Sequence, residues 1–162
     1  MTQPRGASAD RAQRGSATSP VAQRTSTVLV FSHRPEVREA IITAVGRRPA
    51  PDVGRIRFLE AAGIAEVLVA ADAGQIDLAI LDGEAQPTGG MGVSRQLKNE
   101  IDDCPPIIVT VRRRDDRWLA TWSQADAVLV HPLDPLTAAE TVADVLRRTQ
   151  AEADDTPALD RD

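Results

Sequence analysis

The sequence predicts an α/β fold in which a five-stranded parallel sheet is covered by helices on both faces. Short apolar runs alternate five times with amphipathic segments over residues 27–150. The stretch Ile76–Glu84 shows the pattern most clearly, because an apolar run there ends abruptly in Asp82-Gly83-Glu84. Such a run is typical of a strand buried on both faces of a parallel sheet. Strands that alternate with helices require right-handed crossovers, so we expect a doubly wound, flavodoxin-like (βα)5 domain.

The predicted elements follow one another closely. The strands are expected at residues 27–31, 56–59, 76–81, 107–111 and 127–130. The helices are expected at residues 35–46, 64–73 and 93–101, around residues 118–122, and from about 135 to 148. Pro35 suits the first turn of its helix, where its missing N–H has no cost. In the last helix, Leu136, Val142, Val145 and Leu146 are expected to face inward.

The two ends of the chain differ in composition from this central domain. Residues 1–26 are rich in Ser, Thr, Gln, Ala and Arg and contain almost no large apolar residues, which predicts a disordered N-terminal tail. Residues 151–162 predict a mobile, acidic C-terminal tail. We therefore divide the chain into residues 1–26, a domain of residues 27–150, and residues 151–162.

Composition excludes several classes of protein. The formal net charge of −5 argues against general affinity for nucleic acid or for a membrane surface. Cys104 is the single cysteine, which favours a reducing compartment. No apolar run approaches the roughly 18–20 residues of a transmembrane helix, and residues 1–26 lack the apolar core of a secretion signal. We expect a cytoplasmic protein that does not insert into a membrane.

Polar residues collect where the predicted strands end. In open α/β sheets, ligands bind just outside the carboxyl ends of the strands. The residues at these ends are Ser32, His33, Arg34, Asp82, Glu84, Thr110, His131 and Pro132. Any chemistry of the protein is therefore expected around Asp82, which ends the central strand.

The stretches VLVFSHRPEVREAI, IDLAILDGE, PPIIVTV and ADAVLVHPLDP resemble the receiver domain of bacterial two-component response regulators. The resemblance spans residues 27–150. It implies a CheY-like receiver fold in which Asp82 matches the aspartate that accepts a phosphoryl group. It also matches Thr110 to the family's fourth-strand Ser/Thr and Pro132 to the proline that follows a fifth-strand lysine.

The departures from the family pattern concern the residues that surround the phosphoacceptor. Ser32 and His33 replace the acidic pair that holds Mg²⁺ in the family, His131 replaces the lysine, and Val128 replaces the switch aromatic. Mg²⁺ prefers hard oxygen ligands, and phosphoryl transfer depends on it to neutralise developing charge. We therefore predict a pseudo-receiver that is not an enzyme, has no metal site or cofactor, and acts without phosphorylation.

Two alternatives remain open. In one, the protein is a working single-domain response regulator, phosphorylated on Asp82 by a histidine kinase with Mg²⁺ as cofactor. In the other, His33, His131 and Asp82 form a metal- or pH-sensing site, since His suits both uses. The simpler expectation for His131 is a hydrogen bond to Asp82 in place of the family's lysine.

A pair of tryptophans and a run of arginines predict a protein interface. Trp118 and Trp122 lie four residues apart and share one face of a helix. We expect Trp118 to cover the core and Trp122 to be an interface anchor, with Arg112, Arg113 and Arg114 as a charged rim.

The segments LAILDGEAQPTGGMG and QLKNEIDDCPPI are similar to actinobacterial, including mycobacterial, orphan response-regulator-like proteins linked to respiratory complex I, the proton-pumping NADH–quinone oxidoreductase. This resemblance implies an accessory role on subunits of that NADH dehydrogenase. It would place the protein on the cytoplasmic face of the inner membrane through a protein partner.

Overall fold

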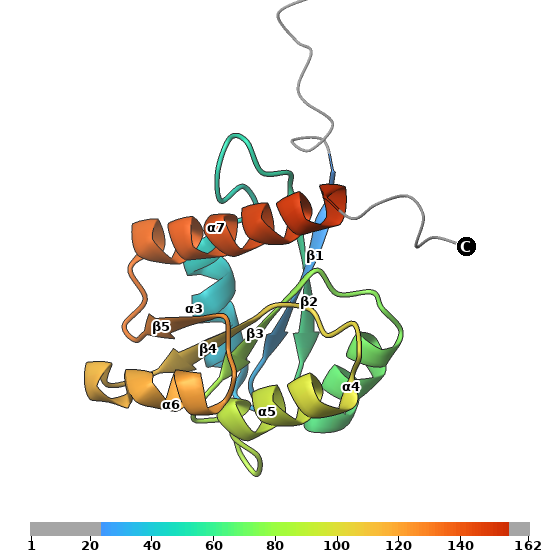
Figure 1. The fold of residues 1–162 in the computed structure, drawn as a ribbon. Coiled ribbons are helices and arrows are strands. Elements are labelled where there is room, and N and C mark those ends of the chain that lie inside the picture. Colours follow the sequence, from blue (N-terminus) through green and yellow to red (C-terminus); the bar gives the residue numbers. More distant parts are fainter. Residues whose placement is uncertain (1–23, 156–162) are drawn as a thin grey trace, which may run out of the picture.

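The computed structural model describes residues 24–155, which form one parallel sheet with helices on both faces (Figure 1). The strand order across the sheet is β2-β1-β3-β4-β5. The strands are β1 (Ser26–Phe31), β2 (Ile56–Ala61), β3 (Leu78–Asp82), β4 (Ile107–Val111) and β5 (Ala127–Val130). The predicted flavodoxin-like fold is confirmed, and β3 occupies the centre of the sheet as expected.

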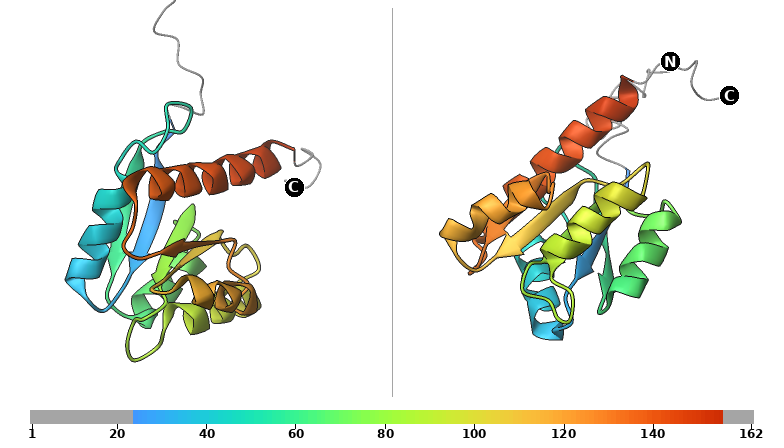
Figure 2. Two further views of the ribbon diagram at one scale, coloured as in Figure 1. Left: turned by 90° about the vertical axis from the view of Figure 1, so that its left-hand side faces the viewer. Right: turned by 60° about the horizontal axis from the view of Figure 1, so that its bottom comes forward.

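The helices divide between the two faces of the sheet, as the views in Figure 2 show. One face is covered by α3 (Pro35–Val45) and α7 (Pro135–Asp154). The other is covered by α4 (Ile64–Asp72), α5 (Gly90–Glu100) and α6 (Arg117–Trp122), with a short 3-10 turn, η1 (Arg114–Asp116), before α6. Among the described residues, no helix is both long and apolar enough to cross a membrane.

The three central strands supply the core. Every residue of β1, β3 and β4 is buried, which agrees with the expectation of strands covered on both faces. Successive residues point to opposite faces, so Val28 and Val30 pack under α3 and α7, while Leu29 and Phe31 pack under the helices of the other face. This arrangement fixes the carboxyl ends of the strands relative to one another.

Three predictions about the helices are wrong. α7 continues to Asp154, so residues 151–154 belong to a helix rather than to a tail; the remaining predicted tail residues, 1–23 and 156–162, lie outside the described residues. Leu136 is 69% exposed, because the buried stripe of α7 runs through Ala138 and Val142, and a residue two positions before Ala138 faces away from it. α5 begins at Gly90, three residues before the predicted start.

α7 begins with a well-formed N-cap. The carboxylate of Asp134 accepts hydrogen bonds from the backbone N–H of Thr137 at 2.9 Å and from its hydroxyl at 2.8 Å. The backbone hydrogen bond, together with the hydroxyl, lowers the pKa of Asp134. Pro135 occupies the first turn, where helices tolerate proline. These residues direct the chain from the end of β5 back over the sheet.

Candidate functional site

The polar residues predicted from the sequence meet at the carboxyl end of the sheet. Asp82 is the last residue of β3 and is 1% exposed. Thr110 of β4 lies directly beside it in the sheet register and is fully buried. Ser32 follows β1 and is also fully buried, and His131 follows β5. The parallel topology therefore brings residues from four strands around one carboxylate.

The carboxylate of Asp82 is bound by groups from its own chain. The Ser32 hydroxyl donates to Oδ2 at 2.7 Å, and the backbone N–H of Glu84 donates to Oδ1 at 2.9 Å. Nη2 of Arg34 lies 3.8 Å from Oδ2, at the outer limit of an ion pair. The backbone N–H of Arg34 donates to the Ser32 hydroxyl at 3.1 Å, which holds that hydroxyl in place. Both oxygens of this buried carboxylate thus have donors, as a buried charge requires.

The two histidines have different surroundings. Nδ1 of His33 accepts a hydrogen bond from the backbone N–H of Gln86 at 2.8 Å, so this ring is engaged with the loop after β3. His131 lines a cavity together with Asp82, but no hydrogen bond joins the two side chains. The predicted His131–Asp82 hydrogen bond is therefore wrong. The donor to Asp82 is the shorter Ser32 side chain.

The cavity beside Asp82 has a volume of about 400 Å³ and is mainly cationic. Its lining includes Arg34, Arg112 and His131. Burial lowers the pKa of His131; the Asp82 carboxylate opposes this shift, and Arg112 and Arg34 add to it. This shift favours the neutral form of the His131 imidazole. The two arginines supply the positive charge of the cavity.

Two buried polar atoms near Asp82 lack a hydrogen-bond partner within the described residues: Nε of Arg34 and Oγ1 of Thr110. Buried polar groups in native structures are rarely left in this state. Thr110 lies beside Asp82, as the resemblance implies. Its hydroxyl, however, donates no hydrogen bond to the carboxylate.

The residues around Asp82 do not suit Mg²⁺. The first position after β1 carries a hydroxyl already bonded to Asp82, the second carries an imidazole bonded to the β3–α5 loop, and the third carries a guanidinium. Mg²⁺ needs hard oxygen ligands, and a nearby cation opposes its binding. The described residues contain no group of three or more His, Cys, Asp or Glu side chains able to hold a metal ion, so the predicted metal-sensing trio of His33, His131 and Asp82 is not assembled.

Two glycines that follow Asp82 lie too close to neighbouring backbone for a side chain. A Cβ added to Gly83 would lie 2.5 Å from the backbone oxygen of Thr110. A Cβ added to Gly90 would lie 2.5 Å from the backbone oxygen of Asp82. The close approach at Gly90 places the first turn of α5 directly against the end of β3.

The tryptophans of α6 form an exposed surface. Trp118 is 65% exposed and Trp122 is 50% exposed. The prediction that Trp118 covers the core is wrong, because the buried residue of this short helix is Ala120. The guanidinium of Arg95, from α5, lies over the ring of Trp122 at 4.6 Å from its centroid. We call Trp118, Trp122 and Arg95 the tryptophan surface.

The three arginines predicted to form a rim around the tryptophans, Arg112, Arg113 and Arg114, do not lie at a single site. Arg112 lines the Asp82 cavity, whereas Arg114 belongs to η1 and lines a separate hollow beside β5 and α7. Arg113 is exposed and immediately precedes η1. Sequence reasoning also missed Arg38 of α3, whose Nη1 donates to the backbone oxygen of Ser32 at 2.7 Å. A basic residue one helical turn after Arg34 is the only signal that pointed to it.

Comparison with curated protein sequences identifies the family, although no family model matches the chain. An uncharacterized response regulatory protein of Mycobacterium tuberculosis, found in strains H37Rv and CDC 1551, is 48% identical over 120 residues, which cover 74% of this chain and 90% of the relative.

Solved structures show the same fold at lower sequence identity. The receiver domain of the Francisella response regulator 1452 superposes with a TM-score of 0.63 at 17% identity, covering 76% of this chain and 98% of that one. The chemotaxis response regulator CheY4 of Vibrio cholerae gives a TM-score of 0.63 at 17% identity, with coverages of 75% and 99%. From the fold, the strand-end residues and the mycobacterial relative together, we conclude that the chain belongs to the response regulators and has a CheY-like receiver domain.

Proposed function

We propose that this receiver is a protein-binding module that acts without phosphorylation. Receiver domains are generally signalling modules rather than enzymes. The observation that carries the proposal is that both carboxylate oxygens of Asp82 already accept hydrogen bonds within the chain. Their donors are the Ser32 hydroxyl and the backbone N–H of Glu84. A phosphoryl group on Oδ2 would compete with the Ser32 hydroxyl, and the acids that would hold its metal are replaced.

The chemistry of the neighbouring residues supports the same proposal. Arg34 and Arg112 supply positive charge, but a guanidinium does not orient an in-line displacement as a bridging metal ion does. Val128 stands on β5 where the family has an aromatic residue, so Thr110 lacks the ring with which it would be coupled. Phosphorylation of Asp82 would therefore lack the coupled movement of Thr110 and an aromatic ring by which receiver domains report it.

The experiment that tests this proposal is incubation with a small phosphodonor, with and without Mg²⁺, followed by intact mass spectrometry. We expect no stable mass increase in the wild type. A phosphoryl adduct that is absent from Asp82→Asn would instead favour phosphotransfer from a histidine kinase. That alternative has support of its own, because Asp82 and Thr110 keep their places side by side in the sheet.

The tryptophan surface is our candidate for the binding face. Exposed Trp and Arg side chains are the residue types most often found at the energetic centre of interfaces. Trp118 and Trp122 project from one helix, and Arg95 already packs on the second ring. We expect Trp122→Ala to reduce recovery of a partner from lysates of the native host, and exposed Val69→Ala on α4 to serve as a control for loss of an apolar side chain elsewhere.

For the partner itself, we propose respiratory complex I. The support is the resemblance of residues 78–92 and 96–107 to actinobacterial orphan response-regulator-like proteins, together with a mycobacterial relative at 48% identity. The protein would then lie at the cytoplasmic face of the inner membrane, held there by protein contacts. Affinity purification from the native host should recover subunits of the NADH dehydrogenase, and their absence from the eluate would remove this assignment.

A further inference from the structure

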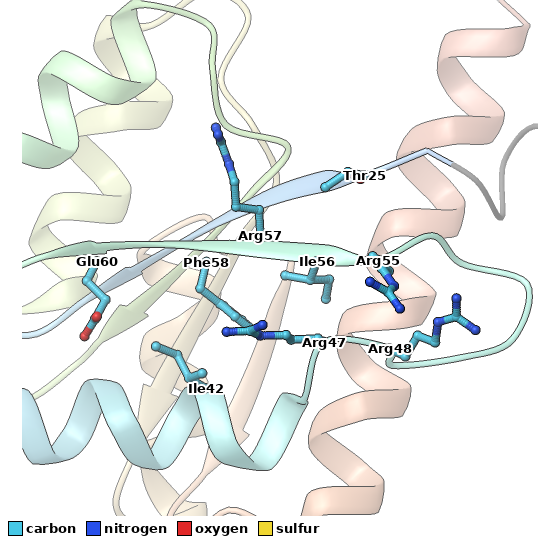
Figure 3. A pocket seen from close by; sticks show the side chains of 9 residues that line it. All are labelled: Thr25, Ile42, Arg47, Arg48, Arg55, Ile56, Arg57, Phe58 and Glu60. Atoms are coloured by element: carbon cyan, nitrogen blue, oxygen red, sulfur yellow. The ribbon is translucent and has the colours of Figure 1, made fainter.

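A groove of about 720 Å³ lies along the outer edge of the sheet, beside β2 (Figure 3). It runs along that strand as far as Glu60, and Arg55 of its lining immediately precedes the amino end of the strand. Its apolar floor is formed by Ile42, Ile56 and Phe58. Its charged lining is formed by Arg47, Arg48 and Arg55, whereas the side chain of Arg57 extends to the opposite side of β2 from Phe58 (Figure 3). We call this site the arginine groove.

The positive charge of the arginine groove is largely uncompensated. Among the described residues, Arg47, Arg48 and Arg55 take part in no ion pair. Arg57 reaches only the hydroxyl of Thr27, at 3.5 Å. The single acid in the lining, Glu60, is bound to Arg38 at 3.0 Å. In a chain with a formal net charge of −5, Arg47, Arg48 and Arg55 around one hollow are a local excess that favours an anionic ligand.

The edge of β2 beside this groove can accept another strand. β2 pairs only with β1, so its outer edge has no strand partner in residues 24–155. The backbone carbonyls of Arg55 and Ala61 accept hydrogen bonds from the backbone N–H groups of Ser26 and Ser32. The backbone N–H and C=O groups of the odd-numbered residues of β2 therefore point toward β1. Alternation along a strand then directs the backbone groups of Phe58 and Glu60 outward.

The chain itself already uses the first position of this edge. The N–H of Ile56 donates to the backbone oxygen of Arg47 at 2.9 Å, so the segment after α3 pairs with β2 at its amino end. The loop that carries these arginines is also fastened to α7, because Asp52 forms a two-pronged ion pair with Arg147 at 2.6 and 2.7 Å. Arg47, Arg48 and Arg55 are therefore presented from an anchored loop.

Protection of an edge strand does not account for the whole cluster. Charged residues on an exposed edge strand prevent pairing with other chains. Arg57 lies on β2 and fits this role, but Arg47, Arg48 and Arg55 lie outside the strand. A cluster that surrounds a hollow with an apolar floor is better matched to a ligand that carries both carboxylates and apolar side chains.

We propose that the arginine groove binds an acidic segment of a partner protein in extended conformation. The segment adds to the outer edge of β2 and pairs with the outward backbone groups of Phe58 and Glu60. Its apolar side chains cover Ile56 and Phe58, and its carboxylates meet the arginines. Strand addition of this kind takes affinity from backbone hydrogen bonds and specificity from side-chain sites. Nucleic acid is disfavoured, because it would leave the strand edge unused.

Fluorescence anisotropy with a labelled peptide tests the proposal. The probe is a glutamate–valine peptide of about ten residues with the repeat Glu-Thr-Val-Thr, so that glutamate and valine alternate along one face of the extended strand. It is added to the full chain at low salt. We expect it to bind, and we expect the double variant Arg47→Glu/Arg55→Glu to weaken binding at least roughly tenfold, because two attractive charges are replaced by repulsive ones. Arg148→Glu, an exposed charge reversal on α7 outside the groove, should change affinity by less than about twofold.

Two further measurements separate strand addition from simple charge attraction. Hydrogen exchange at the backbone amides of Phe58 and Glu60 should slow when the peptide is bound. A peptide of equal charge with prolines at alternate positions should bind at least roughly tenfold more weakly, because proline cannot donate to a strand. The proposal is overturned if the glutamate–valine peptide does not bind, if both peptides bind equally, or if a single-stranded oligonucleotide of about ten nucleotides binds more tightly. Thermal unfolding of the double variant checks that it is folded.

Discussion

Two sites of the domain treat their charged groups differently. At the carboxyl end of the sheet, the carboxylate of Asp82 accepts hydrogen bonds from Ser32 and Glu84. At the arginine groove, by contrast, the guanidinium groups of Arg47, Arg48 and Arg55 meet no carboxylate among the described residues. The difference follows from burial. Asp82 is 1% exposed and must be compensated within the chain, while the exposed guanidinium groups are solvated by water.

The comparison shows which charges are available to a ligand. The charge of Asp82, the residue that matches the family's phosphoacceptor by resemblance, is compensated within the chain, which is why we propose that it does not react. The charge of Arg47, Arg48 and Arg55 has no such compensation among the described residues and can act on another molecule. Stability should therefore depend strongly on the residues around Asp82 and weakly on those of the arginine groove.

The largest effect is expected from Gly90→Ala. The new Cβ would lie 2.5 Å from the backbone oxygen of Asp82 and 2.7 Å from its carbonyl carbon, so α5 must move away from β3. Overpacking of this kind should lower the free energy of unfolding by about 3 kcal/mol, as measured by urea denaturation. Gly92→Ala, two residues along α5, meets only the methyl of Thr88 at 3.6 Å and should be neutral or stabilising. Equal destabilisation of both variants would refute the steric argument.

Ser32→Ala should have the next largest effect. It removes the donor to Oδ2 and leaves a buried carboxylate oxygen without its closest partner, which should cost about 2 kcal/mol. In the background of Asp82→Asn, the same substitution should cost clearly less, and the difference between the two measures the coupling. If Ser32→Ala is equally costly in both backgrounds, the hydroxyl does not act through Asp82.

The pH dependence of stability should report His131. Burial lowers its pKa in the folded protein, so the unfolded chain takes up a proton first as the pH falls. The free energy of unfolding should therefore decrease below about pH 6.5, the ordinary value for histidine. Between about pH 7.5 and 5.5, the wild type should lose more stability than His131→Gln. A larger loss in the variant would mean that the charged form of His131 is favoured by Asp82 after all.

The smallest effect is expected at the arginine groove. Arg47→Glu and Arg55→Glu break no ion pair within the described residues, so each should change the free energy of unfolding by less than about 0.5 kcal/mol. Urea denaturation beside Ser32→Ala makes the comparison between the two ends direct. A loss as large as that of Ser32→Ala would show that the groove is structural.

The fold could be predicted from the sequence because each strand is a short apolar run bounded by turn residues. Element ends were harder to predict: residues 151–154 continue α7, and whether a helix frays or continues depends on small differences in propensity. The exposure of Trp118 could not be predicted either, since α6 has six residues and too short a pattern to fix its buried face.

The candidate site could be predicted as a set of residues but not as a set of bonds. Parallel strands bring their carboxyl ends together, so Ser32, Asp82, Thr110 and His131 had to be neighbours. Which side chain donates to Asp82 depends on the lengths of the side chains and on the path of the loops, and the spacing of residues in the sequence does not determine either. The arginine groove was missed for a similar reason: Arg47 and Arg55 meet only because the loop between them folds back onto β2.

The claim that Asp82 has lost its phosphoacceptor chemistry is tested most directly by restoring what the chain has replaced. The wild type and the triple variant Ser32→Asp/His33→Asp/His131→Lys are each incubated with the same small phosphodonor, with and without Mg²⁺, and their intact masses are compared. We predict no adduct on the wild type in either condition and a Mg²⁺-dependent adduct on the variant. A phosphoryl adduct on wild-type Asp82 that matches that of the variant would contradict the account.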